Sequence, residues 1–504
     1  MDFEHLANAL TLTNLAFALF GVVAGTIIGS IPGLSATMAV AVLVPITFSM
    51  EPASALILLG AIYTGAIYGG AYSAILLNTP GTPSAIGTTF DGYPMAKRGD
   101  GDLAVAIACY ASVFGGMVGA LALLLLAPPL SSVALAFGPV EYLWLSIFGL
   151  SLIASLSTGN VLKGLAGGAF GMLLSCVGVA EISADIRLTF GSPTMIGGIE
   201  VVGALIGLYC IPVLIDLVAT PERHLKVEQG GRAVRFREGA AIAWKSRFNL
   251  LRSSIIGTVI GILPGAGGSV AGLVAYSEAK RTARPGQKFG EGEPDGVMAT
   301  EAANNATVGG GFIPTLVLGI PGTPPDAVIL GALLVQGVRT GPTLFDGGGS
   351  IVYTFIFGLI IATILMLPTG LLIGRYAYKT IVTIPKTILV PSVGFMTIIG
   401  TFAIRNSISD VMIMIVLGTV GWVLSRFGFA ASPIVLGLIL GPIAEQGFVQ
   451  AWIIGDATGN LAGMFFGRPI SLAIIAFTIL SLVYPAIQSR RAKRTLQMQA
   501  GAND

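Results

Sequence analysis

Apolar runs of about 17 to 25 residues recur along the chain, separated by shorter polar stretches that hold most of its charges. An α-helix needs about 20 apolar residues to cross roughly 30 Å of hydrocarbon, and long uncharged runs differ from the alternating segments of a β-barrel. The pattern predicts an all-α integral membrane protein of about 11 transmembrane helices. The predicted spans are residues 53–77, 103–127, 138–157, 162–180 and 196–218, then 297–318, 349–373, 384–403, 409–425 and 430–446, and finally 468–487.

Two more apolar segments, near 14–50 and 253–276, are interrupted at Pro32-Gly33 and at Pro264-Gly265. Proline has no amide hydrogen and glycine tolerates unusual dihedral angles, so both pairs break a helix. The arms 253–263 and 266–276 would each be about 16 Å long at 1.5 Å per residue, half a bilayer, which predicts a broken, re-entrant hairpin. The arms of the first hairpin are longer, so re-entry and a double crossing both stay open there.

An internal repeat relates the two interrupted segments. The nine residues Gly25-Thr-Ile-Ile-Gly-Ser-Ile-Pro-Gly33 return 232 positions later as Gly257-Thr-Val-Ile-Gly-Ile-Leu-Pro-Gly265. A second pair, offset by 241, matches Gly69-Gly70-x6-Leu77-x2-Pro80-Gly81-Thr82-Pro83 with Gly310-Gly311-x6-Leu318-x2-Pro321-Gly322-Thr323-Pro324. Duplicated halves with broken helices are typical of secondary transporters.

The distribution of basic residues predicts the orientation of the chain. If the basic linker 219–252 is placed inside, all but four of the 27 Lys and Arg residues fall on that side, and the exceptions are Arg187, Arg339, Arg405 and Arg468. The positive-inside rule then puts the amino terminus outside and the carboxyl terminus in the cytoplasm. The two repeats start on opposite sides, so they have inverted topology.

These assignments divide the chain into four parts. They are a first inverted repeat of one hairpin and five spans (1–218), the cytoplasmic basic linker (219–252), a second inverted repeat of one hairpin and five spans (253–446), and an external loop with the last span and a basic tail (447–504).

Composition narrows the function class. Hydrophobic residues make up 54% and charged residues 10% of the chain, against about 25% charged residues in soluble domains. Only two histidines and three cysteines are present, without metal-ligand spacing, so the sequence predicts neither an enzyme nor a cofactor. A channel is the main alternative to a secondary transporter.

The Pro-Gly tips are candidate substrate sites, because helix amino termini that point into a cavity suit carboxylates. A kink for helix packing is the competing interpretation, since glycines recur at four-residue spacing in both segments. In the helix after the second hairpin, Glu301, Asn304 and Asn305 lie on one face; Glu301 is open between a functional role and an interhelical hydrogen-bond cluster. The candidate substrate-binding residues are Pro32, Gly33, Ser35, Thr37, Asn78, Gly265, Gly267, Gly268, Ser269, Asn304 and Asn305.

The breaks after the two following spans are candidate cation sites. Both contain Pro-Gly-Thr-Pro, whose carbonyls and hydroxyls no regular helix satisfies, and such groups coordinate small cations such as Na+. A surface turn is the alternative. The candidate cation-binding residues are Thr79, Gly81, Thr82, Ile320, Gly322 and Thr323.

An ordered set of motifs resembles the large membrane subunit of tripartite tricarboxylate transporters, the TctA type, over nearly the whole chain. The motifs are Ile31-Pro-Gly-Leu34, Leu43-Val-Pro-Ile-Thr-Phe48, Tyr68-Gly-Gly70, Ile75-Leu-Leu-Asn-Thr-Pro-Gly81, Asp91-Gly-Tyr-Pro-Met-Ala96, Leu263-Pro-Gly-Ala-Gly267, Phe289-Gly-Glu-Gly292, Glu301-Ala-Ala-Asn-Asn-Ala306 and Leu318-Gly-Ile-Pro-Gly322. Thr300 and Asp295 depart from the family pattern, which commonly has proline and glutamate there.

The resemblance implies a subunit of the bacterial inner membrane that imports citrate-like or other carboxylates with a cation, usually Na+. It also implies two partners, a small four-span membrane subunit (TctB-like) and a periplasmic solute-binding protein (TctC-like). An elevator-type movement of the domain that carries the hairpins is suggested by related ion-transporter folds.

Overall fold

The computed structural model describes residues 3–156, 161–180, 182–219, 235–265, 267–346, 349–380 and 386–483. Residues 220–234 of the predicted linker and the basic tail after 483 therefore lie outside the described residues. The chain forms two compact units: unit 1 contains Met1–Ala134 and Val202–Trp422, and unit 2 contains Leu135–Val201 and Val423–Asp504.

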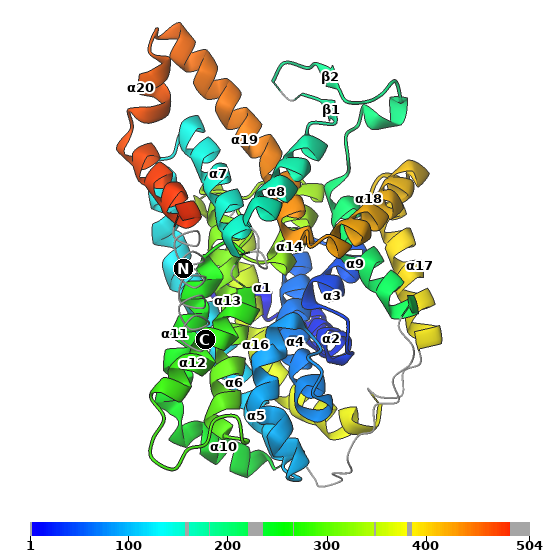
Figure 1. The fold of residues 1–504 in the computed structure, drawn as a ribbon, viewed down its shortest axis with the longest axis vertical. Helices are drawn as coiled ribbons and strands as arrows, with labels where there is room; N and C mark the ends of the chain where they lie inside the picture. The colour runs from blue at the N-terminus through cyan, green and yellow to red at the C-terminus, as the bar shows by residue number, and fades with distance from the viewer. Residues whose placement is uncertain are drawn as a thin grey trace, which may run out of the picture. The chain divides into compact units, whose positions relative to one another are not determined.

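Unit 1 contains both interrupted segments and the helices that follow them (Figure 1). From the first half come α1 (Phe3–Ala9), α2 (Leu12–Ser30), α3 (Ala36–Leu43), the 3-10 helix η1 (Val44–Ser49), α4 (Pro52–Leu77), η2 (Pro83–Ala85), α5 (Ile86–Lys97), α6 (Gly101–Ala134) and α9 (Val201–Ala219). After the linker come α10 (Phe236–Lys245), α11 (Arg247–Ile262), α12 (Gly267–Arg281), α13 (Pro294–Leu318), α14 (Pro324–Val335), α15 (Thr343–Asp346), α16 (Gly349–Thr380), α17 (Lys386–Arg405) and α18 (Ile408–Arg426).

Unit 2 packs α19 against α7 and α8. Its elements are α7 (Pro139–Leu156), α8 (Val161–Ser175), β1 (Gly178–Val179), β2 (Ile186–Arg187), η3 (Pro193–Met195), α19 (Ala431–Ala457), α20 (Leu461–Phe466) and a last apolar helix, Pro469–Val483. The strands β1 and β2 pair antiparallel, with Gly178 opposite Arg187. Arg468 pairs with Glu141 (2.7 Å), and Arg187 pairs with Glu445 (2.7 Å).

The prediction of an all-α membrane protein is confirmed, and each of the 11 predicted spans contains a helix. Eight helices of the described chain are long and apolar enough to cross a membrane, and α2, predicted as a hairpin arm, is one of them. Several predicted bounds were wrong. α6 continues through Pro128 and Pro129 to Ala134, α16 continues to Thr380 and α19 to Ala457. Conversely, α8 already ends at Ser175 and α9 begins only at Val201. Backbone hydrogen bonding can continue a helix beyond its apolar run, so the run alone does not fix where a helix ends.

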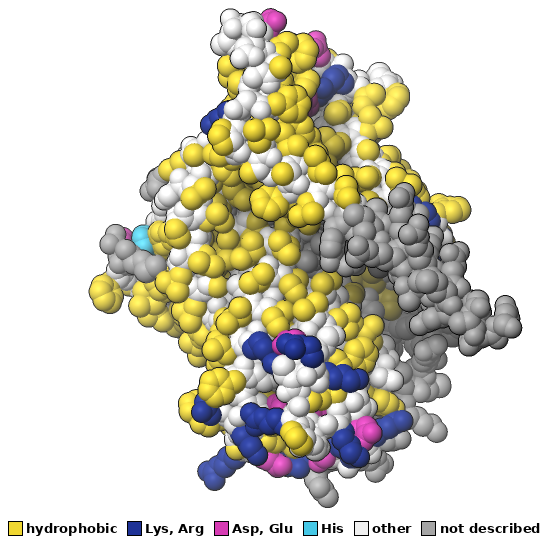
Figure 2. All heavy atoms as spheres, turned by 60° about the vertical axis from the view of Figure 1, so that its left-hand side comes forward, with side chains coloured by type: hydrophobic (Ala, Val, Ile, Leu, Met, Phe, Trp, Pro, Cys, Tyr) yellow, Lys and Arg dark blue, Asp and Glu magenta, His cyan; other side chains and the backbone are white. Residues whose placement is uncertain are grey.

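The arms of the second hairpin are also longer than predicted. α11 begins at Arg247 and α12 ends at Arg281, so the arms are 16 and 15 residues long. The added turns carry charged side chains, and Arg252 on α11 lies 3.8 Å from Glu278 on α12. Figure 2 shows charged side chains gathered at the lower end of the view, with hydrophobic side chains covering the surface just above them.

The helix α10 is tied to α6 at this charged end. Arg235, just before α10, pairs with Asp100 and Asp102 at the start of α6. The hydrogen bond with Asp100 raises the pKa of the Arg235 guanidinium further above its usual value, so this anchor stays charged at any physiological pH.

The helices α4 and α13 form the centre of unit 1. They are repeat equivalents, and every residue from Ser54 to Ile75 and from Gly296 to Val317 is buried. α13, which was predicted as a span, is not among the helices that are long and apolar enough to be candidate membrane spans. A helix that carries Glu301 and two asparagines can lie at membrane depth because protein surrounds it on all sides.

Glycine contacts hold the first arm of each hairpin, α2 and α11, against these central helices. The contacts involve equivalent residues in the two halves. A Cβ on Gly25 would clash with the carbonyl oxygen of Ile62, and one on Gly257 would clash with that of Ala303. Ile62 and Ala303 are 241 positions apart, as the repeat requires. The same holds for Gly29 against Ala66 and for Gly261 against Thr307. The glycine rows are therefore packing surfaces, as one of the two interpretations predicts.

Contacts between the halves are exchanged in pairs. The contact of α3 with α14 is matched by that of α12 with α5. In the same way, the contact of α4 with α16 is matched by that of α13 with α6, and the contact of α2 with α16 by that of α11 with α6. In each pair, a helix of one half contacts a helix of the other half, and their repeat equivalents make the same contact with the halves exchanged. A two-fold relation between the halves has this property. The predicted domain boundaries at 218, 252 and 446 are sequence boundaries and stay a prediction.

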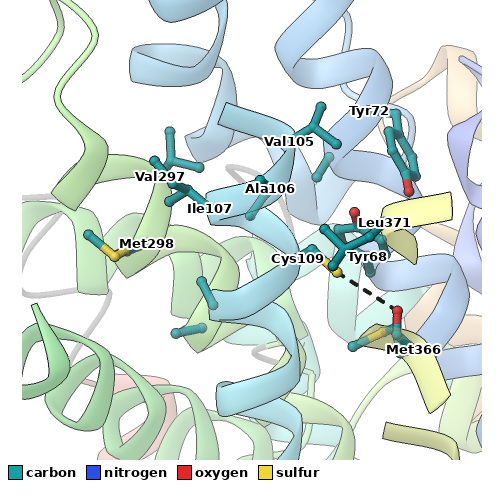
Figure 3. Close-up of a cluster of buried hydrophobic side chains, with 14 of the residues drawn as sticks. Tyr68, Tyr72, Val105, Ala106, Ile107, Cys109, Val297, Met298, Met366 and Leu371 are labelled. Atoms are coloured by element: carbon teal, nitrogen blue, oxygen red, sulfur yellow. Dashed lines mark hydrogen bonds between the residues drawn. The ribbon is translucent and has the colours of Figure 1, made fainter. Parts of the chain in front are cut away.

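A hydrophobic cluster joins α4, α6, α13 and α16 (Figure 3). The rings of Tyr68 and Tyr72 are 5.1 Å apart between centroids, and the Tyr72 hydroxyl donates to the Gly370 carbonyl. The Cys109 thiol points at the Met366 carbonyl, 3.8 Å from sulfur to oxygen. The polar atoms of Tyr72 and Cys109 thus find backbone acceptors on α16, whereas the Tyr68 hydroxyl has no hydrogen-bond partner among the described residues.

We expect Gly257→Ala to lower the thermal stability of the purified protein in detergent. Overpacking against the Ala303 carbonyl costs about 1–3 kcal/mol, which exceeds the gain of about 1 kcal/mol from replacing glycine in a helix. The matched control is Gly272→Ala on α12, where the nearest atom is 3.6 Å away. A Gly257→Ala melting temperature equal to or above that of the control would contradict this account of the packing.

Candidate functional site

The central helices cross at a pair of repeat-equivalent residues. The Thr64 hydroxyl on α4 donates to the Asn305 side-chain oxygen on α13 at 3.0 Å, and the two residues are 241 positions apart. Equivalent residues can touch each other only where the two-fold axis passes between them. Thr64 and Asn305 therefore mark the axis of unit 1.

The neighbouring equivalent pair, Tyr63 and Asn304, differs between the halves. The Tyr63 hydroxyl reaches Thr323 in the break of the other half, 2.9 Å between oxygens. Asn304 is 1% exposed, and neither atom of its amide has a hydrogen-bond partner among the described residues. A buried amide without partners costs about 1–3 kcal/mol, so Asn304 is suited to a polar ligand.

Asn304 lies where the second hairpin meets the break of the first half. A Cβ on Gly268, at the start of α12, would fall on the Asn304 side-chain oxygen and 3.0 Å from the Cβ of Ser84. The hydroxyls of Thr82 and Ser84 are 3.0 Å apart, and α12 packs against η2. The structure thus brings together three predicted residues, Gly268, Thr82 and Asn304. Ser84, a small polar residue after the second proline of the break, was missed.

Ser269, also predicted, follows in the first turn of α12 and is half-buried. Gly267 is the first residue of the same helix and has a φ of +57°. At the tip itself, Gly265 has a φ of +83°, and its amide donates to the Gly322 carbonyl at 2.7 Å. This hydrogen bond joins the second hairpin to the break of its own half.

In the first hairpin, the predicted residues line the turn between α2 and α3. Gly33, which directly follows Pro32, has a φ of +93° and faces Leu217 of α9. Ser35 caps α3 by accepting from the Met38 amide (3.1 Å), and Thr37 is buried in the first turn. The cap uses the Ser35 hydroxyl within the hairpin.

Several backbone amides of both breaks donate to groups within their own halves. The amides of Thr79 and Gly81 donate to the carbonyls of Ser73 and Gly70, and that of Ile320 to Pro314. The Gly322 amide points at the Thr315 hydroxyl at 3.4 Å. Asn78 ends α4 in the left-handed region (φ +51°) and is exposed, apart from the Asn304 cluster.

Glu301 forms an interhelical hydrogen-bond cluster. Its carboxylate is fully buried and accepts from the hydroxyls of Thr88 on α5 and Ser112 on α6, the latter at 3.0 Å. Of the two roles left open by the sequence, the contacts favour the structural one. Satisfied buried carboxylates of this kind join helices.

Asp91 is a second buried carboxylate that sequence reasoning did not assign. One of its oxygens accepts from the amides of Gly290, Gly292 and Glu293, each at 2.8 Å, and the other accepts from the Tyr276 hydroxyl at 2.9 Å. Three amides around one oxygen form an anion-binding nest. Two motifs that are far apart in sequence, Asp91-Gly and Gly290-Glu-Gly292, therefore bind each other.

Arg98 strengthens the same junction, because its guanidinium donates to the carbonyls of Glu291 (2.8 Å) and Gly292 (2.6 Å). Together with Asp91 it latches the loop between α12 and α13 onto α5. The three glycines of this loop, all of which have a φ above +90°, were the signal in the sequence that could have indicated such a nest.

Comparison with known proteins identifies relatives over nearly the whole chain. The Tripartite tricarboxylate transporter TctA family matches residues 15–436. An uncharacterized 52.8 kDa protein in the TAR-I ttuC' 3'region of Agrobacterium vitis is 36% identical over 497 residues, 97% of this chain and 96% of the relative. An uncharacterized protein in the TAR-II ttuC' 3'region of the same organism is 35% identical over 241 residues, 47% of this chain and 97% of the relative. No solved structure matches the chain.

We expect Asp91→Asn to loosen the loop between α12 and α13. Hydrogen bonds to a charged acceptor are worth about 1.5–3 kcal/mol, so the amides of Gly290, Gly292 and Glu293 should exchange hydrogen at least about tenfold faster. Glu291→Gln is the control, because the Glu291 side chain is 67% exposed in its pair with Lys288. Unchanged protection of the three amides in Asp91→Asn would refute the latch.

Proposed function

The chain belongs to the Tripartite tricarboxylate transporter TctA family, and from this premise we propose that it imports tricarboxylates or related carboxylates by cation symport, with Na+ as the coupling cation. It is the large membrane subunit of such a transporter. The observation that carries the proposal is the buried, unpartnered amide of Asn304 between a hairpin tip and the break of the opposite half.

The groups around Asn304 suit a carboxylate. The Asn304 amide can donate to an oxyanion, the hydroxyls of Thr82 and Ser84 lie nearby, and α12 begins there with Gly267 and Gly268. Helix amino termini favour negative charge and offer free amides. No fixed positive side chain is needed, because the first turn of α12 supplies free amides and the break supplies the hydroxyls of Thr82 and Ser84.

We assign the first role in substrate binding to Asn304, Gly268 and Ser269, with Thr82 as a hydroxyl that faces the same cluster. Of the other predicted substrate residues, Asn305 supports the cluster through Thr64. The cation is assigned to the other side of the axis, at the break that contains Thr323.

Alternating access by an elevator-type movement of the domain that carries the hairpins is part of the proposal. It is supported by the exchanged contacts of the two repeats and by the division into two compact units, one of which holds both interrupted segments. A two-fold pseudo-symmetric arrangement allows one site to open to either side of the membrane in turn.

The proposed location is the bacterial inner membrane, with a periplasmic amino terminus and a cytoplasmic carboxyl terminus. The excess of Lys and Arg in the loops assigned to the cytoplasm supports this orientation. Family membership supports two partners, the small four-span subunit and the periplasmic solute-binding protein, which would deliver the carboxylate.

The test is uptake by proteoliposomes that contain the chain with its small subunit, in the presence of the solute-binding protein. We expect labelled citrate, or another member of a panel of di- and tricarboxylates, to accumulate above its external concentration under an inward Na+ gradient. Accumulation should collapse when choline replaces Na+. Flux that only equilibrates the carboxylate, with or without Na+, would instead identify an anion channel or uniporter.

We expect Gly268→Ala to reduce this uptake at least tenfold while membrane insertion and expression stay normal, because the new methyl group falls on the Asn304 amide. Gly272→Ala, one turn further along α12, is the matched control and should retain uptake. Equal uptake by the two variants would remove Asn304 from the site.

A further inference from the structure

A third buried carboxylate, Asp326, lies at the break of the second half, in the first turn of α14. Its side chain is 0% exposed. One oxygen accepts from the Thr323 hydroxyl at 2.5 Å, and the other has no hydrogen-bond partner among the described residues. Because Thr323 also contacts the Tyr63 hydroxyl, the three side chains form one oxygen cluster with an open acceptor.

The described elements with the most contacts to α14 contribute no counter-charge to Asp326. The elements that pack against α14 are α3, η1, α4 and α13, and none of them contains lysine, arginine or histidine. The titratable residues on these elements are Tyr63, Tyr68 and Tyr72 on α4 and Asp295 and Glu301 on α13. Gly311 is the α13 residue beside Asp326, so Asp295 and Glu301 lie ten or more residues away toward the other end of that helix.

An ionised carboxylate is strongly disfavoured in such a place unless a cation accompanies it. Asp91 and Glu301 have their charges dispersed over several donors, whereas one oxygen of Asp326 has no donor among the described residues. Ionisable groups at membrane depth commonly mark ion pathways. The shared requirement is a monovalent cation, either a proton on the carboxylate or Na+ held by the three oxygens.

Resting on the carboxylate transport proposed above, we propose that Asp326, with Thr323 and Tyr63, binds the cation that is coupled to uptake. The cluster adjoins the Asn304 cluster, because Tyr63 and Thr64 are consecutive on α4 and hydrogen-bond to Thr323 and Asn305 respectively. A cation bound by Asp326, Thr323 and Tyr63 would therefore contact the same turn of α4 that hydrogen-bonds to α13, the helix that carries Asn304. Sequence reasoning placed Thr323 among the cation ligands but did not include Asp326.

A competing structural role exists, since a carboxylate in the first turn of a helix also interacts favourably with the helix dipole. Asp410 offers a matched comparison. It is a buried carboxylate in the first turn of α18, and one of its oxygens is also without a partner among the described residues. If the dipole interaction alone matters, Asp326→Asn and Asp410→Asn should behave alike.

The experiment compares wild type, Asp326→Asn and Asp410→Asn in proteoliposomes with both partner subunits. Two readouts are taken: accumulation driven by a cation gradient, and counterflow of labelled against unlabelled carboxylate, which needs no net cation movement. Accumulation is driven either by Na+ at equal pH or by a pH gradient in choline. We expect Asp326→Asn to lose gradient-driven accumulation at least tenfold and to retain counterflow, while Asp410→Asn retains both.

The gradient that loses its effect in Asp326→Asn identifies the cation as Na+ or a proton. Accumulation by Asp326→Asn equal to wild type would overturn the proposal, and so would loss of counterflow in a variant that elutes as a folded complex. Wild type that exchanges carboxylate but responds to neither gradient overturns the coupling site and leaves carboxylate transport standing. Wild type that moves no carboxylate in either assay refutes the proposed function itself.

Thr323→Val and Tyr63→Phe carry the test if Asp326→Asn does not fold, because they keep the carboxylate and remove one hydroxyl each. We expect both variants to require at least tenfold more Na+, or a pH about one unit lower, for half-maximal accumulation. An unchanged cation requirement in both would overturn the assignment.

Discussion

The architecture of unit 1 depends on close contact between glycine-lined arms and two wholly buried helices. α4 and α13 carry polar groups that would be costly against lipid, so both must be enclosed by protein. The glycine rows of α2 and α11 permit this, because they let backbone approach backbone with no side chain between. A single methyl group at Gly25, Gly29, Gly257 or Gly261 would meet a carbonyl oxygen of the central helix. The same small residues that interrupt the apolar pattern thus build the interior in which a polar site can exist.

Because α4 and α13 are enclosed by protein, a single different side chain between the two halves changes which buried polar groups find a hydrogen-bond partner. On the axis, Thr64 and Asn305 satisfy each other in part. One position earlier, a tyrosine reaches across to the opposite break, while its equivalent, Asn304, ends short of any partner among the described residues. Pseudo-symmetry supplies two equivalent positions, and the exchange of tyrosine for asparagine makes their hydrogen bonding different. We assign the asparagine side to the carboxylate and the tyrosine side to the cation.

Three buried carboxylates in unit 1 show how surroundings set the role of one functional group. Glu301 accepts from two hydroxyls and joins three helices, and Asp91 accepts from three amides and a phenol and holds a loop. Both are satisfied by neutral donors, so their charge is dispersed within the structure. Asp326 accepts only from Thr323, and its second oxygen has no partner among the described residues, which is why we assign it to a mobile cation.

The sequence by itself determined the membrane class, the helical spans, the two interruptions and the repeat, because apolar length and proline-glycine pairs act locally and the equivalence of two segments is visible in their letters. It also identified Asn304, Gly268 and Thr82 as polar or flexible positions in unusual places. Only the tertiary structure decided which of these meet, since Gly265 and Gly322 satisfy each other, Asn78 lies exposed, and Ser84 joins from a position that no pattern distinguishes. The roles of Asp91 and Asp326 were beyond the sequence for the same reason. Whether a carboxylate is neutralised by amides, hydroxyls or a bound cation depends on contacts between residues some 200 or more positions apart, such as Asp91 with Gly290 and Tyr63 with Thr323.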